Sequence, residues 1–262
     1  MYRSMLYVPA HSERFVGKAH ERGADAIILD LEDAVPEADK DAARAGLASA
    51  VARVGQGGAA VLVRINSGAR AMDDARAAVV AKVAAIVVAK AEPLGLTALA
   101  PLGVPLLALL ESPAAILDAR ACAAIPAVMG TMVGGEDLAT ALGARAVPEV
   151  LRMPKLLAHY ATKAEGKLSF GMLRSIADYS DLAAIKASAE EARMHGFDGA
   201  SCVHPSVVPV LNAAFAPSAE EIAWAKRVVE AATGNDGAFA LDGQMVDKPV
   251  VERARAVLAK AR

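Results

Sequence analysis

Cysteine is scarce in this sequence: Cys122 and Cys202 are the only two among its 262 residues. They lie far apart and form no Cys-x-x-Cys motif, so we predict neither a disulfide framework nor a zinc site. The segment from Met1 to Pro9 has no basic stretch followed by the long apolar run of a secretory signal. Free, buried thiols and a reducing, cytoplasmic location are therefore expected.

The sequence has neither a large excess of one charge nor a long apolar segment that could form a membrane-spanning helix. The formal net charge is -2, and no run of Lys and Arg alternates with aromatic residues, so nucleic acid is not an expected partner. The longest uncharged stretch, Pro93 to Leu110, is interrupted by glycine and proline. It does not supply the roughly 20 continuous helical residues that span a bilayer, and we expect no membrane partner.

Aromatic residues make up only 4% of the chain, although 55% of it is hydrophobic. The core must then consist mainly of Ala, Val, Leu and Ile, which fill the layers inside a parallel barrel well. The length of the chain is close to the roughly 250 residues of one such barrel. One large core is the simplest organisation.

Apolar runs alternate with Ala-rich segments of helical periodicity, which is the βαβα pattern of a parallel sheet. The expected strands are Met5–Pro9, Ala26–Glu32, Ala59–Ile65, Ala85–Ala89, Pro105–Leu110, Ala127–Val133, Lys167–Leu173 and Gly199–Val203. The expected helices between them include Ser12–Arg22, Glu37–Val54, Ala69–Lys82, Pro113–Ala123, Pro148–Glu165 and Asp181–His195. No Gly-x-Gly-x-x-Gly motif follows the first strand, as it would in a Rossmann fold. The pattern therefore predicts an α/β fold of the (β/α)8 TIM barrel type.

The C-terminal portion departs from this alternation. A helix is expected at Ser218–Ala232, the turn-rich residues 233–249 follow, and a last helix is expected at Val250–Lys260. We predict that residues 1–232 form the barrel and that residues 233–262 form a lid or arm reaching a neighbouring subunit.

Six of the apolar runs end in charged or metal-capable side chains. In a parallel barrel all strands point the same way, so such endings gather on the rim where these barrels carry their chemistry. The endings are Asp30-Leu-Glu-Asp33, Arg64-Ile-Asn66, Lys90-Ala-Glu92, Glu111-Ser112, Gly134-Gly-Glu-Asp137 and His204-Pro205. The sequence thus predicts an active site on this rim.

Glu111 and Asp137 end neighbouring strands of the predicted barrel. Two carboxylates on one rim, completed by waters, hold a hard divalent cation, and Mg²⁺ is the natural candidate. The alternative is structural: the two acids form salt bridges or cap helices, and Asp137 would cap a helix that begins at Leu138.

Arg64 ends the third strand, where a guanidinium binds a carboxylate at two points or stabilises developing negative charge. A structural ion pair is the alternative. Asp30 and Glu32 are expected on one face of the second strand, near the wet end of the barrel. Asp33 instead suits the N-terminus of the next helix.

The remaining strand endings carry weaker signals. Lys90 and Glu92 are expected to pair with the nearby acids in an orienting role, because buried charges need partners. Gly134 and Gly135 permit close approach of an anion to a helix with free N–H groups. His204 belongs to no recognisable nucleophile motif, and we expect a structural role for it.

Taken in order along the chain, these motifs resemble the HpcH/HpaI aldolase and citrate lyase β-subunit (CitE-like) family. The resemblance covers nearly the whole chain and is closest to the CoA-thioester lyases, which include stand-alone CitE-like, malyl-CoA and citramalyl-CoA lyases. It rests on Arg3-Ser-Met-Leu-Tyr-Val-Pro9, Leu29-Asp-Leu-Glu-Asp-Ala-Val35 with Lys40 and Arg44, Arg64-Ile-Asn66, Lys90, Glu111, Gly134-Gly-Glu-Asp-Leu138, Gly196-Phe-Asp-Gly199, His204-Pro205 and Asp242-Gly-Gln-Met-Val-Asp247.

The resemblance implies a set of site residues on the rim. Mg²⁺, or Mn²⁺ in its place, would be held at Glu111 and Asp137. Arg64 would lie beside the metal and contact the substrate, while Asp30 and Glu32 would support water or ligands bound to the metal. We also assign substrate binding to the neighbouring pair Gly135 and Glu136.

Further residues are implied outside the rim. Asp247 matches the aspartate of the family's C-terminal motif, and it is our candidate for proton transfer at the acetyl carbon. That segment commonly closes over the site of an adjoining subunit, so a homo-oligomer is expected, a trimer or a multiple of trimers. Arg14 and Lys18 would contact CoA phosphates, and an exposed helical face is the alternative for them.

The implied reaction is the reversible cleavage of a 3-hydroxyacyl-CoA, of citramalyl-CoA or malyl-CoA type, into acetyl-CoA and a 2-oxo acid. One alternative is a CoA-independent class II aldolase acting on hydroxy-oxo acids with the same metal and Arg64. Another is a non-catalytic CitE-like subunit that binds acyl carriers. Two segments depart from the family pattern around the rim: Gly199-Ala-Ser201, without the usual lysine, and the stretch from Leu168 to Asp181.

Overall fold

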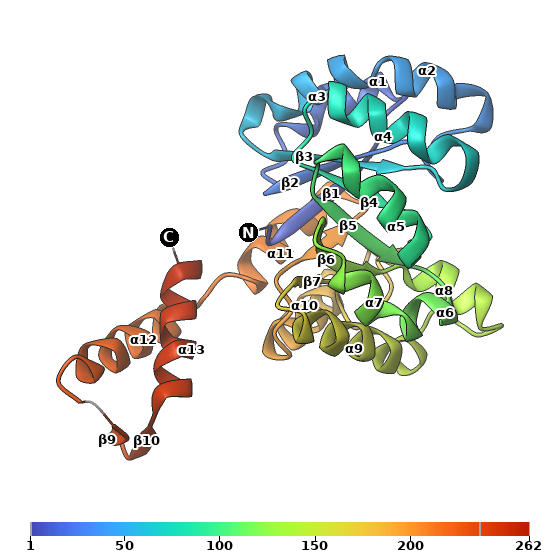
Figure 1. The fold of residues 1–262 in the computed structure, drawn as a ribbon. Coiled ribbons are helices and arrows are strands. Elements are labelled where there is room, and N and C mark those ends of the chain that lie inside the picture. The colour runs from blue at the N-terminus through green and yellow to red at the C-terminus, as the bar shows by residue number, and fades with distance from the viewer. Residues whose placement is uncertain (1, 236, 262) are drawn as a thin grey trace. The chain divides into compact units, whose positions relative to one another are not determined.

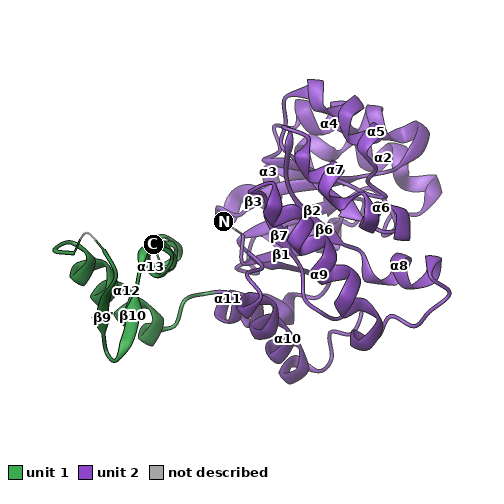
Figure 2. Cartoon of the chain, turned by 60° about the horizontal axis from the view of Figure 1, so that its bottom comes forward, with its two compact units in different colours: residues 1, 216–262 green, residues 2–215 purple. Residues whose placement is uncertain are grey.

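The computed structural model describes residues 2–235 and 237–261, whose helices and strands are drawn in Figure 1. Tyr2–Phe215 form one compact unit, and Ala216–Arg262 belong to a second (Figure 2). Across the described parts of both units, no helix is both long and apolar enough to cross a membrane.

The first unit, called here the barrel unit, contains eight parallel strands. They are β1 (Ser4–Pro9), β2 (Ala26–Asp30), β3 (Ala60–Ile65), β4 (Ala85–Val88), β5 (Leu106–Leu110), β6 (Val128–Val133), β7 (Leu168–Phe170) and β8 (Ala200–Cys202). Their order in the sheet is β7-β6-β5-β4-β3-β2-β1-β8. A bridge between Phe170 and Gly199 brings the two edges of this sheet together. The expected (β/α)8 TIM barrel is confirmed.

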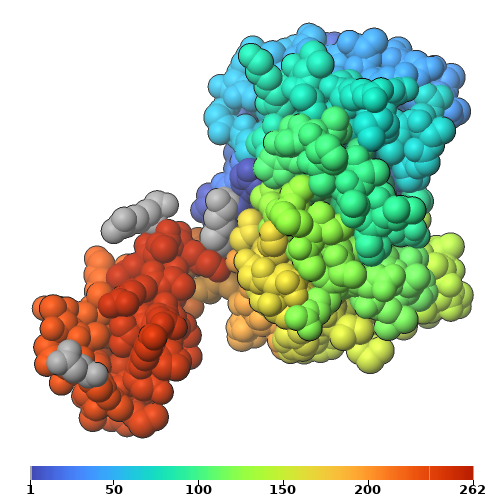
Figure 3. Space-filling view, in the orientation of Figure 1, coloured from blue at the N-terminus to red at the C-terminus, as the bar shows by residue number. Residues whose placement is uncertain are grey.

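Helices follow the strands and cover the outside of the barrel, as the alternating pattern predicts. They are α1 (Glu13–Ala19), α2 (Lys40–Ala45), α3 (Leu47–Val54), α4 (Ala71–Val80), α5 (Pro93–Leu99), α6 (Pro113–Leu117), α7 (Ala119–Ala124), α8 (Gly135–Ala141), α9 (Pro148–Ala164), α10 (Leu182–Met194) and α11 (Val208–Ala214). In the space-filling view, successive stretches of the chain appear as neighbouring bands of colour over the barrel unit (Figure 3). Several helices contact the strand that precedes them, such as α1 with β1 and α4 with β3.

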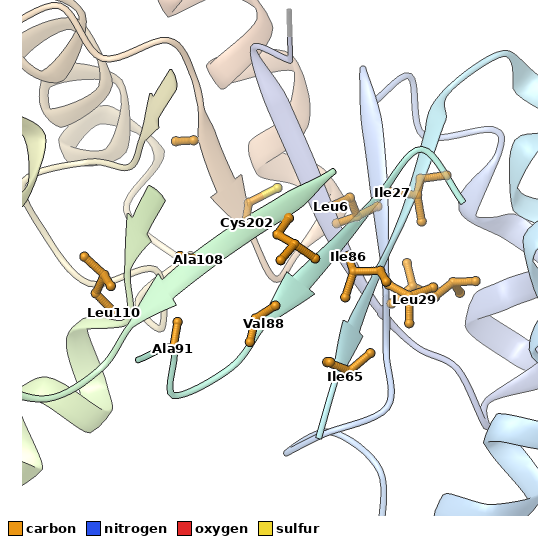
Figure 4. Close-up of a cluster of buried hydrophobic side chains, with 14 of the residues drawn as sticks. Leu6, Ile27, Leu29, Ile65, Ile86, Val88, Ala91, Ala108, Leu110 and Cys202 are labelled. Atoms are coloured by element: carbon orange, nitrogen blue, oxygen red, sulfur yellow. The ribbon is translucent and has the colours of Figure 1, made fainter. Parts of the chain in front are cut away.

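Alternate residues of each strand enter two separate cores. Leu6, Ile27 and Leu29 point outward into the layer between sheet and helices, together with Ile86 and other side chains of the cluster shown in Figure 4. The inward-pointing residues form a second cluster inside the barrel, which includes Met5, Ile28, Leu62, Leu107 and Phe170. This two-residue period decides which polar side chains at the strand ends face the interior.

Several elements differ in extent from the expectation. The single helix expected at Glu37–Val54 is a 3-10 turn at Glu37–Asp39 followed by α2 and α3, which are separated by Gly46, a weak helix former. Strand β7 covers three residues rather than 167–173, because Gly171 has φ 147°, a conformation that takes the chain out of the sheet. Strand β2 ends at Asp30, so Glu32 lies in the following turn.

The C-terminal unit has a small core of its own. Helix α12 (Ala219–Ala232) begins at a capping box formed by Ser218 and Glu221. The hairpin of β9 (Phe239–Leu241) and β10 (Gln244–Val246) leads to α13 (Lys248–Lys260). The buried side chains of this small core are Ala225, Val228, Val246, Val251 and Ala254.

The division of the chain therefore falls between residues 215 and 216, rather than between 232 and 233. Helix α12, expected as part of the barrel, belongs to the C-terminal unit because its buried face packs with α13 and β10. The change follows from tertiary packing, since the amphipathic pattern of α12 resembles that of a barrel helix.

Candidate active site at the carboxyl ends of the strands

A cavity of about 440 Å³ opens at the carboxyl ends of the barrel strands. Six of the residues given catalytic, substrate-binding or metal-binding roles from the sequence line it: Asp30, Arg64, Glu111, Gly135, Glu136 and Asp137. They come from β2, β3, β5 and the start of α8, elements far apart along the chain. The structure thus brings the main predicted site residues into one place.

The inward period of the strands explains why these side chains meet. In β2 the interior residues are Ala26 and Ile28, and Asp30 is the next residue on that face. In β3, Leu62 is followed on the same face by Arg64. Glu111 follows Leu109 of β5 in the same way. Apolar side chains fill the barrel, and the inward face of β2, β3 and β5 continues to a polar residue at the carboxyl end.

Arg64 and Asp30 form a buried ion pair. The Arg64 Nε donates to Asp30 Oδ1 at 2.7 Å, and Nη2 donates to Oδ2 at 2.6 Å. The Asp30 carboxylate also accepts the backbone N–H groups of Glu32, at 2.9 Å, and Ala34, at 3.1 Å. Burial opposes the charge on Arg64, but the hydrogen bonds to Asp30 outweigh it and raise the guanidinium pKa. Asp30 therefore positions a permanently charged Arg64.

Nη1 of Arg64 faces two further acids. It lies 2.8 Å from Glu32 Oε2 and donates to Asp33 Oδ2 at 3.2 Å. Glu32 is buried, whereas the side chain of Asp33 is 58% exposed. Asp33 therefore pairs with Arg64 rather than capping a helix. Being exposed, it is also the partner that an incoming anion displaces most easily.

Lys90 links two carboxylates of the site. Its Nζ pairs with Glu32 Oε1, and its backbone N–H donates to Glu111 Oε2 at 2.6 Å. The backbone reaches this position because Lys90 has φ 49°, in the left-handed region. The predicted pairing of Lys90 with the acids is confirmed. Glu92, by contrast, is exposed at the residue before α5 and lies outside the cavity lining.

A polar network behind the cavity holds the turn that follows β2. Lys40 Nζ donates to the carbonyl oxygens of Leu31 and Glu32 and to Asn66 Oδ1, at 3.1, 2.7 and 2.6 Å. Asn66 in turn donates to the buried carboxylate of Asp74. These contacts keep Glu32 at the rim although it is no longer part of the strand.

Glu111 and Asp137 line the cavity together, one buried and one exposed. Burial, together with the nearby charges of Glu32 and Asp137, raises the pKa of Glu111 to about 8, although the N–H of Lys90 opposes the shift. A Cβ on Gly134 would lie 2.7 Å from Glu111 Oε1, so only glycine leaves room for this carboxylate. Asp137 is in the first turn of α8, whose N-cap is Gly134, so the capping role considered for it is wrong.

These acids suit a hard divalent cation that keeps most of its waters. The described residues contain no group of three or more His, Cys, Asp and Glu side chains placed to hold a metal. Mg²⁺ does not require such a group, because it is commonly bound through one or two carboxylates and several waters. A buried carboxylate with a raised pKa, beside a second acid on the same cavity, fits that type of site.

Three cavity residues did not stand out in the sequence. Tyr7 projects from β1, and the Arg64 guanidinium lies 5.1 Å from its ring centroid, as in a cation–π contact. Lys155 lies on the buried face of α9, and Ser175 lies in the loop after β7. The signal for Lys155 is its spacing: it shares one helical face with Leu151 and Ala158, where an apolar residue is normal.

Other predicted residues are not among those that line the cavity. Arg14 and Lys18 are exposed on α1 and do not line it. His204 Nδ1 lies 2.7 Å from Ser206 Oγ, and its ring stacks on Tyr179, as expected of a structural histidine. Asp247 belongs to the C-terminal unit, where its side chain accepts the N–H of Val250 at 3.3 Å and caps α13.

The fold and the cavity define a class of protein: a parallel (β/α)8 barrel with two carboxylates and a buried arginine at the carboxyl ends of its strands. The model of the HpcH/HpaI aldolase/citrate lyase family matches residues 3–93 and 80–205. The chain belongs to this family.

Similar proteins cover almost the whole chain. A citrate lyase subunit beta-like protein of Mycobacterium tuberculosis is 37% identical over 98% of this chain and 94% of its own. A (3S)-malyl-CoA thioesterase of Cereibacter sphaeroides is 36% identical over 99% and 94%. The crystal structure of CitE from Mycobacterium tuberculosis, in complex with magnesium, acetoacetate and coenzyme A, superposes with a TM-score of 0.82 at 35% identity, covering 98% and 97%.

Proposed function

We propose that this protein is a Mg²⁺-dependent carbon–carbon lyase. It reversibly cleaves a 3-hydroxyacyl-CoA, of the citramalyl-CoA or malyl-CoA type, into acetyl-CoA and a 2-oxo acid. The observation that carries the proposal is the grouping of Arg64, Glu111 and Asp137 around one cavity. The similar CitE structure, which holds magnesium, acetoacetate and coenzyme A, supports the same assignment.

Glu111 and Asp137 would hold Mg²⁺, or Mn²⁺ in its place, with water completing the coordination. When bound, the metal polarises the carbonyl of the 2-oxo acid. Arg64, which lines the cavity, would stabilise the negative charge that develops on the reacting oxygens. Asp30 and Glu32 orient Arg64 and Lys90, so their proposed part in catalysis is one of positioning.

Asp247 is proposed to move the proton at the methyl carbon of the acetyl group. A carboxylate is a competent base when it is shielded from water beside its target. Gly135 and Glu136, on the cavity wall, are proposed to bind the substrate. Arg14 and Lys18 are proposed to bind the CoA phosphates from their exposed positions on α1.

We further propose that the chain works as a homo-oligomer, a trimer or a multiple of trimers. In this assembly the C-terminal unit supplies Asp247 to the site of a neighbouring subunit.

The decisive experiment is a panel of malyl-CoA, methylmalyl-CoA, citramalyl-CoA and citryl-CoA, incubated with the protein and either Mg²⁺ or EDTA. The 2-oxo acid and free thiol are both quantified. We expect release of a 2-oxo acid with acetyl-CoA, dependent on Mg²⁺ and abolished in Asp137→Asn. Glu149→Gln, an exposed acid in the first turn of α9, is the matched control.

Other product patterns contradict the proposal. Release of free CoA with the intact hydroxy acid would identify a thioesterase, the activity named for the Cereibacter sphaeroides relative. Cleavage of free hydroxy-oxo acids without CoA would identify the class II aldolase. No turnover of any substrate, together with tight binding of acyl carriers, would identify a non-catalytic subunit.

A further inference from the structure

One wall of the cavity is formed by residues 171–177, called here the wall segment. It follows β7 and contains neither helix nor strand. Gly171, Met172, Ser175, Ile176 and Ala177 all line the cavity. Their side chains are mostly apolar, in contrast to the acids and the arginine that share the same space. The shape of the cavity therefore depends on how this irregular segment is held.

A single buried ammonium group holds the middle of the wall segment. Lys155 Nζ donates to the carbonyl oxygens of Met172, at 2.9 Å, and Arg174, at 2.6 Å. The Lys155 residue is only 4% exposed. Because the two carbonyl groups lie two residues apart, this one side chain fixes the path of the backbone between them.

A second contact ties the wall segment to the helix that carries Asp137. The Ser175 hydroxyl donates to Glu136 Oε1, and the same hydroxyl oxygen accepts the N–H of Ala177 at 3.1 Å. Glu136 and Asp137 are adjacent in the first turn of α8. The wall segment is thus connected to both α9 and α8.

Burying the Lys155 ammonium group costs free energy, and the stability of the fold does not by itself account for a lysine at this position. Desolvation lowers the pKa of its ammonium group to about 8, and the charge of Glu136 only partly opposes this effect. A buried charge generally destabilises a protein relative to a well-packed apolar side chain. Two of the three ammonium hydrogens are donated to backbone carbonyl groups of the wall segment, so the hydrogen bonds of the buried charge are made to this segment.

We propose that Lys155 is a positioning residue that sets substrate specificity by holding the wall segment in place. This inference rests on the proposed lyase function. When two substrates differ by one methyl group, a fixed apolar wall makes their kcat/KM values differ by about 10–200-fold. A mobile wall adapts to both substrates, and the separation is lost.

The test compares kcat/KM for malyl-CoA and citramalyl-CoA, which differ by one methyl group. The wild-type protein should differ at least about tenfold between the two. In Lys155→Met this ratio should move toward one, and in Ser175→Ala it should move in the same direction by less. Lys155→Arg, which keeps the donors, should recover part of the ratio. A ratio of one in the wild type, or an unchanged ratio in Lys155→Met, overturns the proposal.

Lys163→Met is the matched control. Lys163 is also on α9, and its Nζ pairs with Asp198 instead of the wall segment. Loss of this lysine should lower stability without moving the substrate ratio. A shift equal to that of Lys155→Met would mean that any lysine lost from α9 has the same effect, which also overturns the proposal.

Amide hydrogen exchange separates a failure of this inference from a failure of the proposed function. In Lys155→Met, the amides of residues 171–177 should exchange at least about tenfold faster, while those of β6 keep their protection. If the wild type cleaves neither substrate, the lyase function fails and the exchange data alone decide the role of Lys155. Equal exchange in both proteins overturns that role whether or not the enzyme is active.

Discussion

Asp30 and Arg64 are register partners on the neighbouring parallel strands β2 and β3, and their side chains meet in a two-point ion pair inside the barrel. The Arg64 side chain is 11% exposed and that of Asp30 is 1% exposed. The pair therefore places a fixed positive charge at the boundary between an apolar core and a cavity lined by acids.

Substitution of Asp30 by Asn should remove the two-point, buried anion of Arg64 and leave only the contacts of Nη1 with Glu32 and Asp33. Breaking a buried pair by removing one partner costs about 3–5 kcal/mol, so we expect a loss of that order in the free energy of unfolding. Urea denaturation measures it. Asp73→Asn is the control, because Asp73 pairs with Arg76 at an exposed position where an ion pair contributes about 0–1 kcal/mol. Equal losses at the two positions would contradict the role given to Asp30.

The left-handed backbone at Lys90 predicts that a glycine variant is more stable than an alanine variant at this position. Lys90→Gly and Lys90→Ala both remove the pairing with Glu32, but only glycine adopts φ 49° without strain. Lys90→Ala should therefore be less stable than Lys90→Gly by about 1 kcal/mol, as measured by urea denaturation. Arg76 is exposed on helix α4, where alanine is favoured over glycine. Arg76→Ala should therefore be more stable than Arg76→Gly, the reverse of the order at Lys90. The same order at both positions would refute the backbone argument.

Glu111→Gln should have opposite effects on the free energy of unfolding without and with Mg²⁺. The folded-state pKa of Glu111 is raised from 4.5 to about 8. Between these values the folded protein binds more protons than the unfolded chain, so its stability falls as pH rises. Without metal, Glu111→Gln should therefore be more stable than the wild type at pH 8, and the difference should shrink toward pH 5.

Addition of Mg²⁺ should reverse that ranking. Saturation to 100 times the dissociation constant stabilises a folded protein by about 2.7 kcal/mol, and the wild type should gain this amount. Glu111→Gln should gain little, and thermal unfolding with and without Mg²⁺ measures both. An equal Mg²⁺ response in the two proteins would place the metal elsewhere.

Asp247→Asn should reduce turnover by the roughly 10²–10⁴-fold typical of losing general acid–base catalysis. Asparagine also serves as an N-cap, so α13 should keep its cap and the C-terminal unit its fold. Circular dichroism and Mg²⁺ binding should match the wild type. Asp242→Asn, in the turn between β9 and β10, is the control and should retain activity. Wild-type turnover in Asp247→Asn would refute the assignment.

Mixed oligomers test whether the site is shared between subunits. Asp247→Asn and Arg64→Lys should each be inactive alone, because lysine lacks the planar two-point geometry of arginine. Co-expression of the two should restore part of the activity, since some sites in a mixed assembly would contain both native residues. No recovery in oligomers confirmed as mixed by native mass spectrometry would show that each chain supplies its own Asp247.

Much of the barrel could be predicted because its signals are local. Apolar runs of strand length alternate with segments of helical periodicity, and the runs of β2 and β3 end in the inward-facing polar residues Asp30 and Arg64. Element boundaries were less predictable. Gly171 ends β7 earlier than the apolar run does, and Gly46 divides a helix whose periodicity looks continuous.

The contacts of the site were harder to predict than its members. Lys155 and Ser175 lie 20 residues apart and in no known motif, yet Lys155 holds the wall segment to which Ser175 belongs, and Ser175 ties that segment to α8. Tyr7 looks like one more apolar residue of β1 until Arg64 is seen against its ring. Such contacts join residues from different strands and helices, so no local pattern records them.

By itself the sequence determined the class of fold, the family and the inward polar residues, because the two-residue period of strands and the order of motifs are properties of the chain. Only the tertiary structure decided that Asp30 is committed to Arg64, that Lys90 bridges Glu32 and Glu111, and that Lys155 holds the wall segment. It also assigned α12 to the C-terminal unit. The reason is physical: the partner of a buried charge or an apolar face is set by which elements the closed barrel brings together.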